Sequence, residues 1–162
     1  MIPFDFDYYR PATVREAVNV YKELAEADKA PVYYGGGTEL ISMARVHSLN
    51  FGAVVDLKTI PETRVLELTD NKLILGAALT LSQIVEAGQF PLLVKTAGRI
   101  ADHTMQDKIT LGGNLNASII YRETVLPLLL TQALLVIAGP NGLRKARVEG
   151  AFTKRLNLAK GE

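Results

Sequence analysis

The hydrophobic pattern near the N-terminus switches between helical and strand periods. Apolar residues recur at helical spacing from 14 to 25, and Thr13 with Glu16 three positions later forms a predicted capping box. Short apolar runs at 31–34 and 53–57 predict buried strands. The first segment of the chain therefore predicts one amphipathic helix followed by two strands.

A second helix is expected between these two strands. Thr38 is predicted to cap it, and its body is expected from Glu39 to about Val46. A strand, a helix and a strand at this spacing predict a small βαβ lobe with parallel strands, which we assign to residues 1–57.

After residue 57 the pattern changes to paired strands and short helices. Thr80 with Gln83 predicts a capping box, and Pro91 predicts a helix start. The expected elements are strands at 65–68 and 73–79, helices at 80–88, 91–101 and 123–133, and a hairpin of 134–138 with 143–148. The predicted fold class is α+β, with a second, mainly antiparallel lobe over residues 58–162.

Composition limits the chemistry that the chain can perform by itself. The 162 residues carry a formal net charge of +1, so charge gives no support for binding nucleic acid or an anionic membrane. There is no cysteine, which excludes a disulfide framework, a thiolate zinc site and an iron–sulfur cluster bound by this chain. Redox chemistry would have to come from a bound cofactor or a partner.

The sequence offers no membrane segment. The start of the chain lacks the basic and apolar regions of a signal peptide, and the longest apolar stretch, 126–138, is interrupted and too short to span a bilayer. We therefore expect no membrane insertion and a cytoplasmic location.

Two glycine-rich motifs carry the strongest functional signal. They are Gly35-Gly36-Gly37-Thr38-Glu39 and Thr110-Leu111-Gly112-Gly113-Asn114. Glycine lets backbone N–H groups approach a ligand, and a helix N-terminus next to them favours phosphate. Neither motif has the spacing of a Walker loop or a Rossmann site. Two such loops, facing one another across a seam between the lobes, predict a dinucleotide-binding module.

The other polar residues have ordinary structural explanations. The two histidines, His47 and His103, lack the carboxylate neighbours of a metal site, and no serine sits in a nucleophile elbow. Glu123 lies near a helix start, where a carboxylate favours the helix dipole. We predict no catalytic side chain and no metal ligand.

The motifs, taken in order, resemble a known family. The chain is similar to the FAD-binding subunit, or medium chain, of molybdenum hydroxylases such as xanthine dehydrogenase and aerobic carbon monoxide dehydrogenase. The segments that carry the resemblance are 4–11, 33–40, 54–57 with 60–62, 75–82 and 110–114. The resemblance runs in order over essentially all 162 residues.

The resemblance implies an FAD site between the lobes, with the first motif on the pyrophosphate. The implied residues at the diphosphate and ribityl end are Tyr33, Tyr34, Gly35, Gly36, Gly37, Thr38, Glu39 and Leu40. Those on the second wall are Ile100, Ala101, Thr110, Gly113 and Asn114, and Glu123 stands where the family commonly has an Asp that touches the cofactor. The implied partners are an iron–sulfur subunit and a molybdopterin subunit, with NAD+ as the usual acceptor.

Three departures from the family pattern leave alternatives open. Residues 106–108 read Gln-Asp-Lys where the family usually has Arg-Asn, and 118–120 read Ser-Ile-Ile where it has Ser-Pro. We also expect the family's usual C-terminal domain, which would follow Glu162, to be absent. The alternatives are a truncated assembly or interaction module that does not retain flavin, and a domain for another nucleotide diphosphate. The phosphate interpretation also predicts that Gly36→Val abolishes FAD binding while the fold survives.

Overall fold

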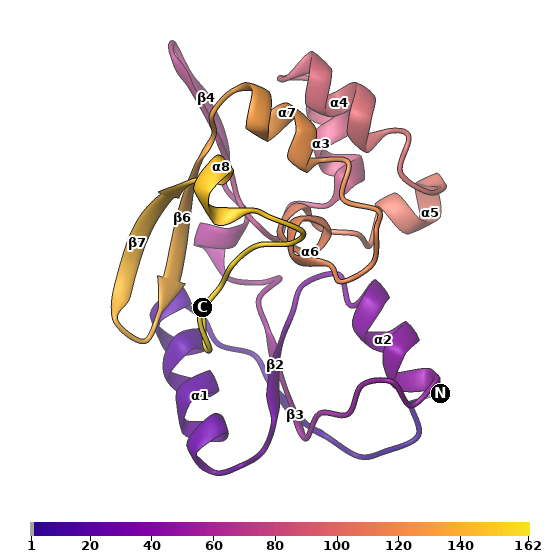
Figure 1. Cartoon of the computed structure of the whole chain (residues 1–162), viewed down its shortest axis with the longest axis vertical. Coiled ribbons are helices and arrows are strands. Elements are labelled where there is room, and N and C mark those ends of the chain that lie inside the picture. The colour runs from indigo at the N-terminus through magenta and orange to yellow at the C-terminus, as the bar shows by residue number, and fades with distance from the viewer. Residues whose placement is uncertain (1) are drawn as a thin grey trace.

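The N-terminal part of the chain forms a three-stranded parallel sheet with one helix on each face. The computed structural model describes residues 2–162, so Met1, at the start of the first predicted lobe, lies outside the described residues. The elements of this parallel unit are β1 (Asp7–Tyr9), α1 (Val14–Glu26), β2 (Pro31–Tyr34), α2 (Thr38–Arg45) and β3 (Ala53–Asp56). They occupy the lower half of the view in Figure 1.

The strand order β1-β3-β2 puts the two helices on opposite faces. The connection from β1 to β2 passes over β3, and the connection from β2 to β3 runs back in the opposite direction. Two crossovers of the same handedness that run in opposite directions place their helices on opposite faces of the sheet. Side-chain alternation along β3 follows this arrangement. Val55 packs with Ala17 of α1, whereas Val54 packs with Ala44 of α2.

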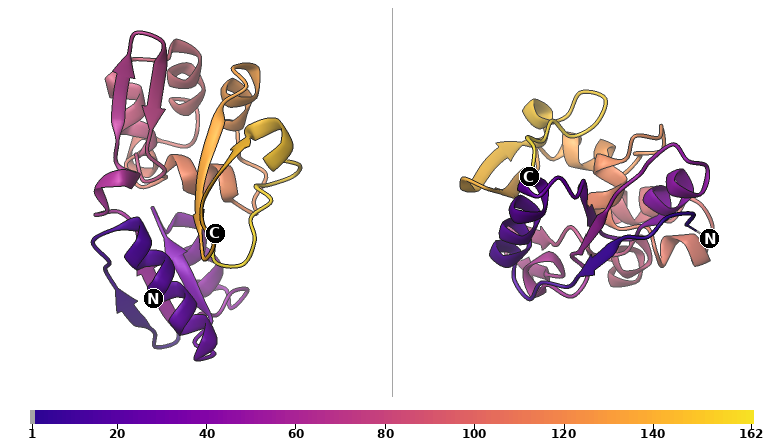
Figure 2. Two further views of the ribbon diagram at one scale, coloured as in Figure 1. Left: turned by 90° about the vertical axis from the view of Figure 1, so that its left-hand side faces the viewer. Right: turned by 90° about the horizontal axis from the view of Figure 1, so that it is seen from below.

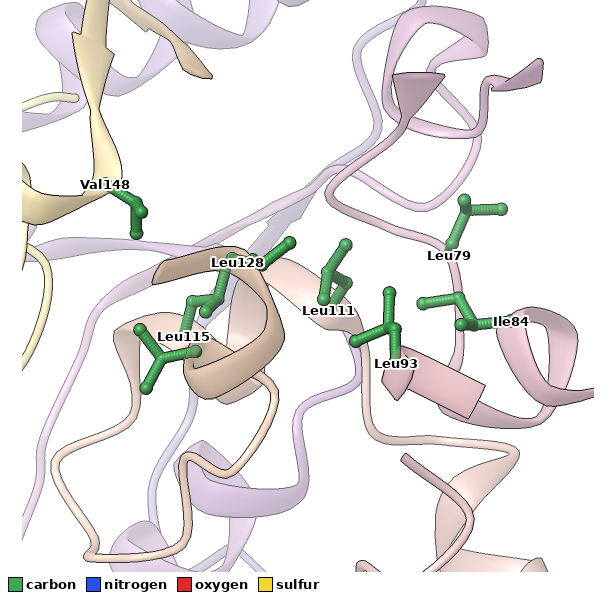
Figure 3. Close-up of a cluster of buried hydrophobic side chains, with 8 residues drawn as sticks. Leu79, Ile84, Leu93, Leu111, Leu115, Leu128 and Val148 are labelled. Carbon is green, nitrogen blue, oxygen red and sulfur yellow. The ribbon is translucent and has the colours of Figure 1, made fainter. Parts of the chain in front are cut away.

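The rest of the chain forms an antiparallel unit of two hairpins and several short helices. It contains a 3₁₀ turn (Pro61–Thr63), β4 (Leu66–Thr69), β5 (Lys72–Leu75), α3 (Leu81–Ala87), α4 (Pro91–Ala97), α5 (His103–Gln106), α6 (Leu111–Asn116), α7 (Val125–Leu130), β6 (Leu134–Gly139), β7 (Gly142–Arg147) and α8 (Val148–Ala151). Figure 3 shows its main core, in which leucines from α4, α6 and α7 meet Ile84 and Val148. This core fixes α6, which carries the second glycine motif.

The predicted α+β class is confirmed, and both predicted hairpins are present. Five short elements were not predicted, namely β1, the 3₁₀ turn, α5, α6 and α8. The helix expected at 91–101 ends at Ala97, because Gly98 caps it and Ala101 adopts a positive φ of 54°. The strand expected at 73–79 ends at Leu75, and the helix expected at 123–133 covers only Val125–Leu130.

The capping predictions have mixed outcomes. Thr80 and Gln83 form the full reciprocal capping box. Thr13 accepts a hydrogen bond from the Glu16 N–H as expected, but the Glu16 carboxylate accepts from the Ala12 N–H at 2.7 Å rather than from Thr13. The expected box at α1 is therefore wrong in its second bond, since the carboxylate reaches one residue further back.

The C-terminal segment returns to the parallel unit. The Tyr33 hydroxyl donates to the Gly161 carbonyl at 3.0 Å, and Arg144 of β7 binds Glu162 through two contacts of 2.6 Å. Figure 2 shows the C-terminus next to the first helix and sheet. Within residues 2–162, no helix combines the length and apolar character needed to cross a bilayer.

Candidate functional site

The first glycine motif connects the end of β2 to the start of α2. Gly37 has a φ of 71° and is the N-cap residue of α2, so the expectation that Thr38 caps this helix is wrong. A Cβ on Gly37 would lie 2.1 Å from the Tyr34 ring. The chain turns there through the left-handed region, which favours glycine, and Thr38 becomes the first helical residue.

The backbone N–H groups of this motif are free. Among residues 2–162, no acceptor binds the N–H groups of residues 35 to 40, and the first helical bond runs from the Ile41 N–H to the Gly37 carbonyl at 2.9 Å. Consecutive free N–H groups at a helix N-terminus form a cradle for an anion. We call residues 35–40 the amide cradle.

The second glycine motif is the first turn of α6, so its prediction as a loop is wrong. Thr110 caps the helix, and all four following N–H groups have acceptors within the chain. The acceptors are Leu79 O for Leu111, Ala77 O for Gly112, Thr110 Oγ1 for Gly113 and Thr110 O for Asn114, at 2.8–3.2 Å. The N–H groups of residues 111–114 are therefore not available to a ligand.

The two motifs lie against one another, as the sequence predicted. A Cβ on Gly36 would stand 1.6 Å from the Lys108 carbonyl oxygen, and one on Gly35 would stand 2.8 Å from Thr110 Oγ1. The first two glycines are therefore needed for contact between the units. We call this contact, between residues 35–39 and 108–119, the seam.

Glu39 joins the units on the same side of the molecule. Its carboxylate accepts hydrogen bonds from the N–H groups of Ser118 and Ile119, at 2.9 and 3.1 Å, and from the Ser118 hydroxyl. Arg122 holds the same loop by donating to the carbonyls of Ala117 and Ser118. Glu39 therefore acts as a clamp across the seam.

The side chains of Asn114 and Glu123 differ in whether they have partners within the chain. The Asn114 amide donates to the Tyr121 carbonyl at 3.0 Å, and its oxygen accepts from the Thr124 hydroxyl. Glu123 Oε2 is the one buried side-chain nitrogen or oxygen among residues 2–162 that has no hydrogen-bond partner. A buried acceptor without a donor is costly, so this atom suits a ligand that supplies a hydroxyl or N–H.

The remaining predicted site residues are spread over both units. Tyr33 stacks on Tyr21 of α1 at 4.5 Å between ring centroids, and burial raises the pKa of its hydroxyl. Tyr34 points to the opposite face of the sheet, where Leu40 lines a cavity. Ile100 is buried within the antiparallel unit. The structure thus brings the glycines together with Thr110, but not with Tyr33 or Ile100.

Sequence reasoning missed a cavity of about 450 Å³ beside α2. Asp56, the last residue of β3, accepts hydrogen bonds there from the Tyr8 hydroxyl, from the Lys58 N–H at 2.9 Å and from Lys58 Nζ at 2.7 Å. Burial opposes the charge on Asp56, but the Lys58 and Tyr8 bonds outweigh it and hold its pKa below the usual range. The sequence signal that could have indicated this site is Asp56, a single carboxylate at the end of a buried strand, followed two residues later by Lys58.

The order and contacts of these elements match a known family. Residues 4–162 match the family described as the FAD binding domain in molybdopterin dehydrogenase. The chain belongs to this family. It is 30% identical over 157 residues to the carbon monoxide dehydrogenase medium chain of Hydrogenophaga pseudoflava, covering 94% of this chain and 53% of that protein.

Other relatives and solved structures agree on the fold. The chain is 24% identical to the nicotinate dehydrogenase FAD-subunit of Eubacterium barkeri, over 91% of this chain and 51% of that one. A structure of the Hydrogenophaga pseudoflava carbon monoxide dehydrogenase superimposes with a TM-score of 0.90 at 26% identity, covering 99% of this chain and 57% of that chain. Quinoline 2-oxidoreductase from Pseudomonas putida 86 has the same fold, with a TM-score of 0.88, 22% identity and the same two coverages. The chain spans about half the length of the curated relatives it matches.

Two further observations limit the chemistry of the site. Within residues 2–162, no group of three or more His, Asp or Glu side chains is placed to hold a metal ion. The groups closest to the three glycines of the amide cradle are the Thr110 hydroxyl, the Lys108 carbonyl and the Tyr34 ring. The arrangement is suited to binding and orienting an anionic ligand.

Proposed function

We propose that this chain is the FAD-binding electron-transfer component of a molybdenum hydroxylase complex. In this proposal electrons pass from iron–sulfur clusters on a partner subunit, through the flavin, to NAD+ or another acceptor. A molybdopterin subunit of the same complex would carry out the substrate chemistry. Membership of the FAD-binding family supports the cofactor, and the multi-subunit character of the relatives supports the partners.

The amide cradle is the observation that carries the proposal. Six consecutive N–H groups, residues 35–40, have no acceptor within residues 2–162 and surround the start of α2. An FAD pyrophosphate carries negative charge and many acceptor oxygens, so it matches both the free donors and the helix dipole. The N–H groups of residues 37–40 are those that any helix start leaves unpaired, and Gly35 and Gly36 extend the run toward β2.

Residues in the seam and Glu123 near it would orient the ligand. Glu123 supplies an unpaired carboxylate oxygen, which suits a ribityl hydroxyl as donor. Thr110 and Gly35 hold the two motifs in contact. When bound, the flavin supplies the electron-transfer chemistry, and this chain supplies binding, orientation and electrostatic surroundings.

The proposal is tested by adding FAD to the purified chain, desalting it and recording its visible absorption. We expect flavin bands to be retained at about one flavin per chain. Thr38→Asp adds a carboxylate to the first turn of α2, which favours the helix but repels phosphate. We expect it to weaken FAD binding about tenfold or more without lowering the melting temperature.

Asn50→Asp is the matched control, since it adds the same charge at an exposed position outside the cradle. Equal FAD affinity in both variants would show that the cradle does not hold the phosphates. No retained flavin in the unmodified chain would contradict the proposed function itself.

A second candidate is an assembly module that keeps the fold without retaining flavin. One observation favours it: the Glu39 carboxylate already binds Ser118 and Ile119, so the seam is held together without any ligand. The desalting experiment separates the two candidates, because only the first predicts bands that survive. A colourless chain that binds a cysteine-rich iron–sulfur partner would support the second.

A further inference from the structure

The β6–β7 hairpin has one covered face and one bare face. Side chains alternate along β6, so Leu135 packs against the main core and Ile137 is buried, and α1 contacts the same strand. The side chains between them point the other way, where Leu134 is 57% exposed and Val136 is 61% exposed. In Figure 1 the hairpin forms the left-hand edge of the molecule. Its outer face is therefore open to a partner.

The register of the hairpin places cations next to the apolar side chains of this bare face. Arg147 is the cross-strand partner of Leu134. Lys145 is the partner of Val136, and Leu143 lies on the same face next to the turn. Paired residues of this kind have Cβ atoms about 5 Å apart, and all three of these β7 side chains are exposed. The face thus carries an apolar row on β6 and a cationic row on β7. We call its members the hairpin face, namely Leu134, Val136, Leu143, Lys145 and Arg147.

The cations of the hairpin face are not neutralised by the part of the chain that the structure describes. Within residues 2–162 neither Lys145 nor Arg147 forms a salt bridge, although Arg147 donates to the carbonyl and side-chain oxygens of Gln132. Arg144 lies on the opposite face and is paired with Glu162. The segment 144–160 as a whole contains six Lys or Arg residues and one Glu. This end of the chain therefore has an excess of positive charge that the net charge of +1 conceals.

Exposed apolar side chains with cations beside them mark an interaction site, and the combination selects the kind of partner. A nucleic acid backbone would bind the cations and leave the apolar row uncovered. Proteins that lie on anionic membranes use amphipathic helices or lipid anchors, whereas this face is a two-stranded sheet. A second copy would bring its own cations to the same rows, and like charges in contact oppose association. A protein helix with an apolar stripe flanked by Asp and Glu would cover the apolar row and neutralise the cationic row.

We propose that the hairpin face docks an acidic amphipathic helix of another protein. The six residues of β6 span about 20 Å, which matches the length of a helix of about 13 residues. Helices cover the faces of sheets through an apolar stripe, as α1 does on the parallel sheet. None of the five residues belongs to the amide cradle or the seam. The inference therefore goes beyond the proposed function and can be tested separately from it.

The test is a titration of a fluorescently labelled synthetic peptide with the full chain, followed by fluorescence anisotropy. The probe peptide forms a helix of about five turns with leucines along one stripe and glutamates along one flank. A comparison peptide carries lysines in place of the glutamates. We expect the glutamate peptide to bind about tenfold or more tightly than the lysine peptide, and its affinity to fall as the salt concentration rises.

Two variants locate the binding on the hairpin face. Lys145→Glu reverses a charge of the cationic row, and Val136→Ser removes an apolar side chain from the other row. Each should weaken binding of the glutamate peptide about fivefold or more. Lys72→Glu and Ile74→Ser are the matched controls, because both residues are exposed on β5 of the other hairpin. The controls should leave the affinity within about twofold of the unmodified chain.

Several results would overturn the proposal. It is wrong if the two peptides bind equally, if neither binds, or if the hairpin-face variants behave like their controls. Binding of a DNA duplex or of phosphatidylserine vesicles that depends on Lys145, without binding of the glutamate peptide, would assign the face to that other partner. A dimer in analytical ultracentrifugation that Val136→Ser dissociates would assign it to a second copy. Lys145→Glu, at an exposed side chain, keeps the test decisive if Val136→Ser fails to fold. No measurement here uses FAD, so the proposed function stands in each case.

Discussion

The two glycine motifs look alike in the sequence but differ in what their backbones do. Among residues 2–162 no acceptor binds the N–H groups of residues 35–40, whereas the N–H groups of 111–114 are all bonded within the chain. Both motifs contain adjacent glycines and a threonine. The first motif is equipped for a ligand, and the second is equipped to hold α6 against the rest of the antiparallel unit.

The difference arises from what lies next to each motif. The second motif runs beside residues 77–79, whose carbonyls take its donors, and Gly112 is needed because a Cβ there would lie 2.8 Å from the Ala77 Cβ. The first motif follows a strand end, where no carbonyl of residues 2–162 comes within reach of its donors. Glycine in the first motif permits a left-handed turn and close contact across the seam, and in the second it permits close packing.

The largest expected effect comes from Gly36→Ala. The new Cβ would lie 1.6 Å from the Lys108 carbonyl, so the units must move apart. We expect a loss of about 3 kcal/mol or more in the free energy of unfolding. This replaces the sequence-based expectation that a larger Gly36 side chain leaves the fold intact, because the clash is with protein backbone. Urea unfolding measures it.

Gly150→Ala is the control for that comparison. A Cβ at Gly150, in α8, would meet nothing within 4 Å. We expect this variant to change stability by less than about 1 kcal/mol, toward stabilisation, since alanine favours a helix. Equal stability of the Gly36 and Gly150 variants would show that the units do not touch at the first motif.

The next effect concerns the clamp between the units. Glu39→Gln keeps the size of the side chain but removes the charge that attracts the N–H groups of Ser118 and Ile119. We expect a loss of about 1–2 kcal/mol by urea unfolding. Glu67→Gln, at an exposed position on β4, should stay within about 0.5 kcal/mol. If the two variants are indistinguishable, Glu39 is free for another role.

A smaller difference in stability is expected between variants of Thr110 and Thr38, the threonines of the two motifs. Thr110→Val removes the cap of α6, in which Oγ1 accepts from the Gly113 N–H at 3.2 Å, and should cost about 1 kcal/mol. Thr38→Val should change stability by less than about 0.5 kcal/mol, because the Thr38 side chain caps no helix. Thermal unfolding of the pair tests this. A larger loss for Thr38 would contradict the capping found here.

The smallest expected effect lies beside the first motif, at the Tyr8–Asp56 bond. The hydrogen bond to Asp56, followed by burial, raises the pKa of Tyr8 to about 12. The bond therefore stabilises the fold fully below the ordinary tyrosine value of 10.0 and is lost as pH rises through about 12. For Asp56 the pKa is lowered, so its stabilisation is present above 3.8 and is lost on acidification.

Tyr8→Phe measures this contribution across pH. Tyr8 is half exposed, so we expect a loss below about 1 kcal/mol at neutral pH. The difference from the unmodified chain should shrink at both acid and alkaline pH. A difference that does not vary with pH would mean that the hydroxyl acts by packing rather than through Asp56.

Local signals in the sequence predicted the regular elements well. The helix opened by Thr13 and both hairpins follow from periodicity, caps and turn residues that lie within a few positions of one another. The strand β1 was missed because its three residues, 7–9, show no hydrophobic alternation and are held by pairing with β3. Short elements such as α5 likewise depend on their surroundings.

The site was only partly predictable, because its chemistry depends on contacts between distant residues. Whether an N–H is free depends on remote carbonyls, such as Leu79 O for Leu111. Glu39 gives no local sign that it binds Ser118, which lies in the other unit. The cavity beside Lys58 likewise forms only when three parallel strands end together.

Tyr33, just before the first motif, and Glu39, at its end, each form a hydrogen bond to the antiparallel unit. Tyr33 bonds to Gly161 near the C-terminus, and Glu39 bonds to Ser118 beside α6. In Figure 1 the C-terminus and α2 lie on opposite sides of the parallel sheet. A hinge motion that separates the two units must therefore break both hydrogen bonds at once.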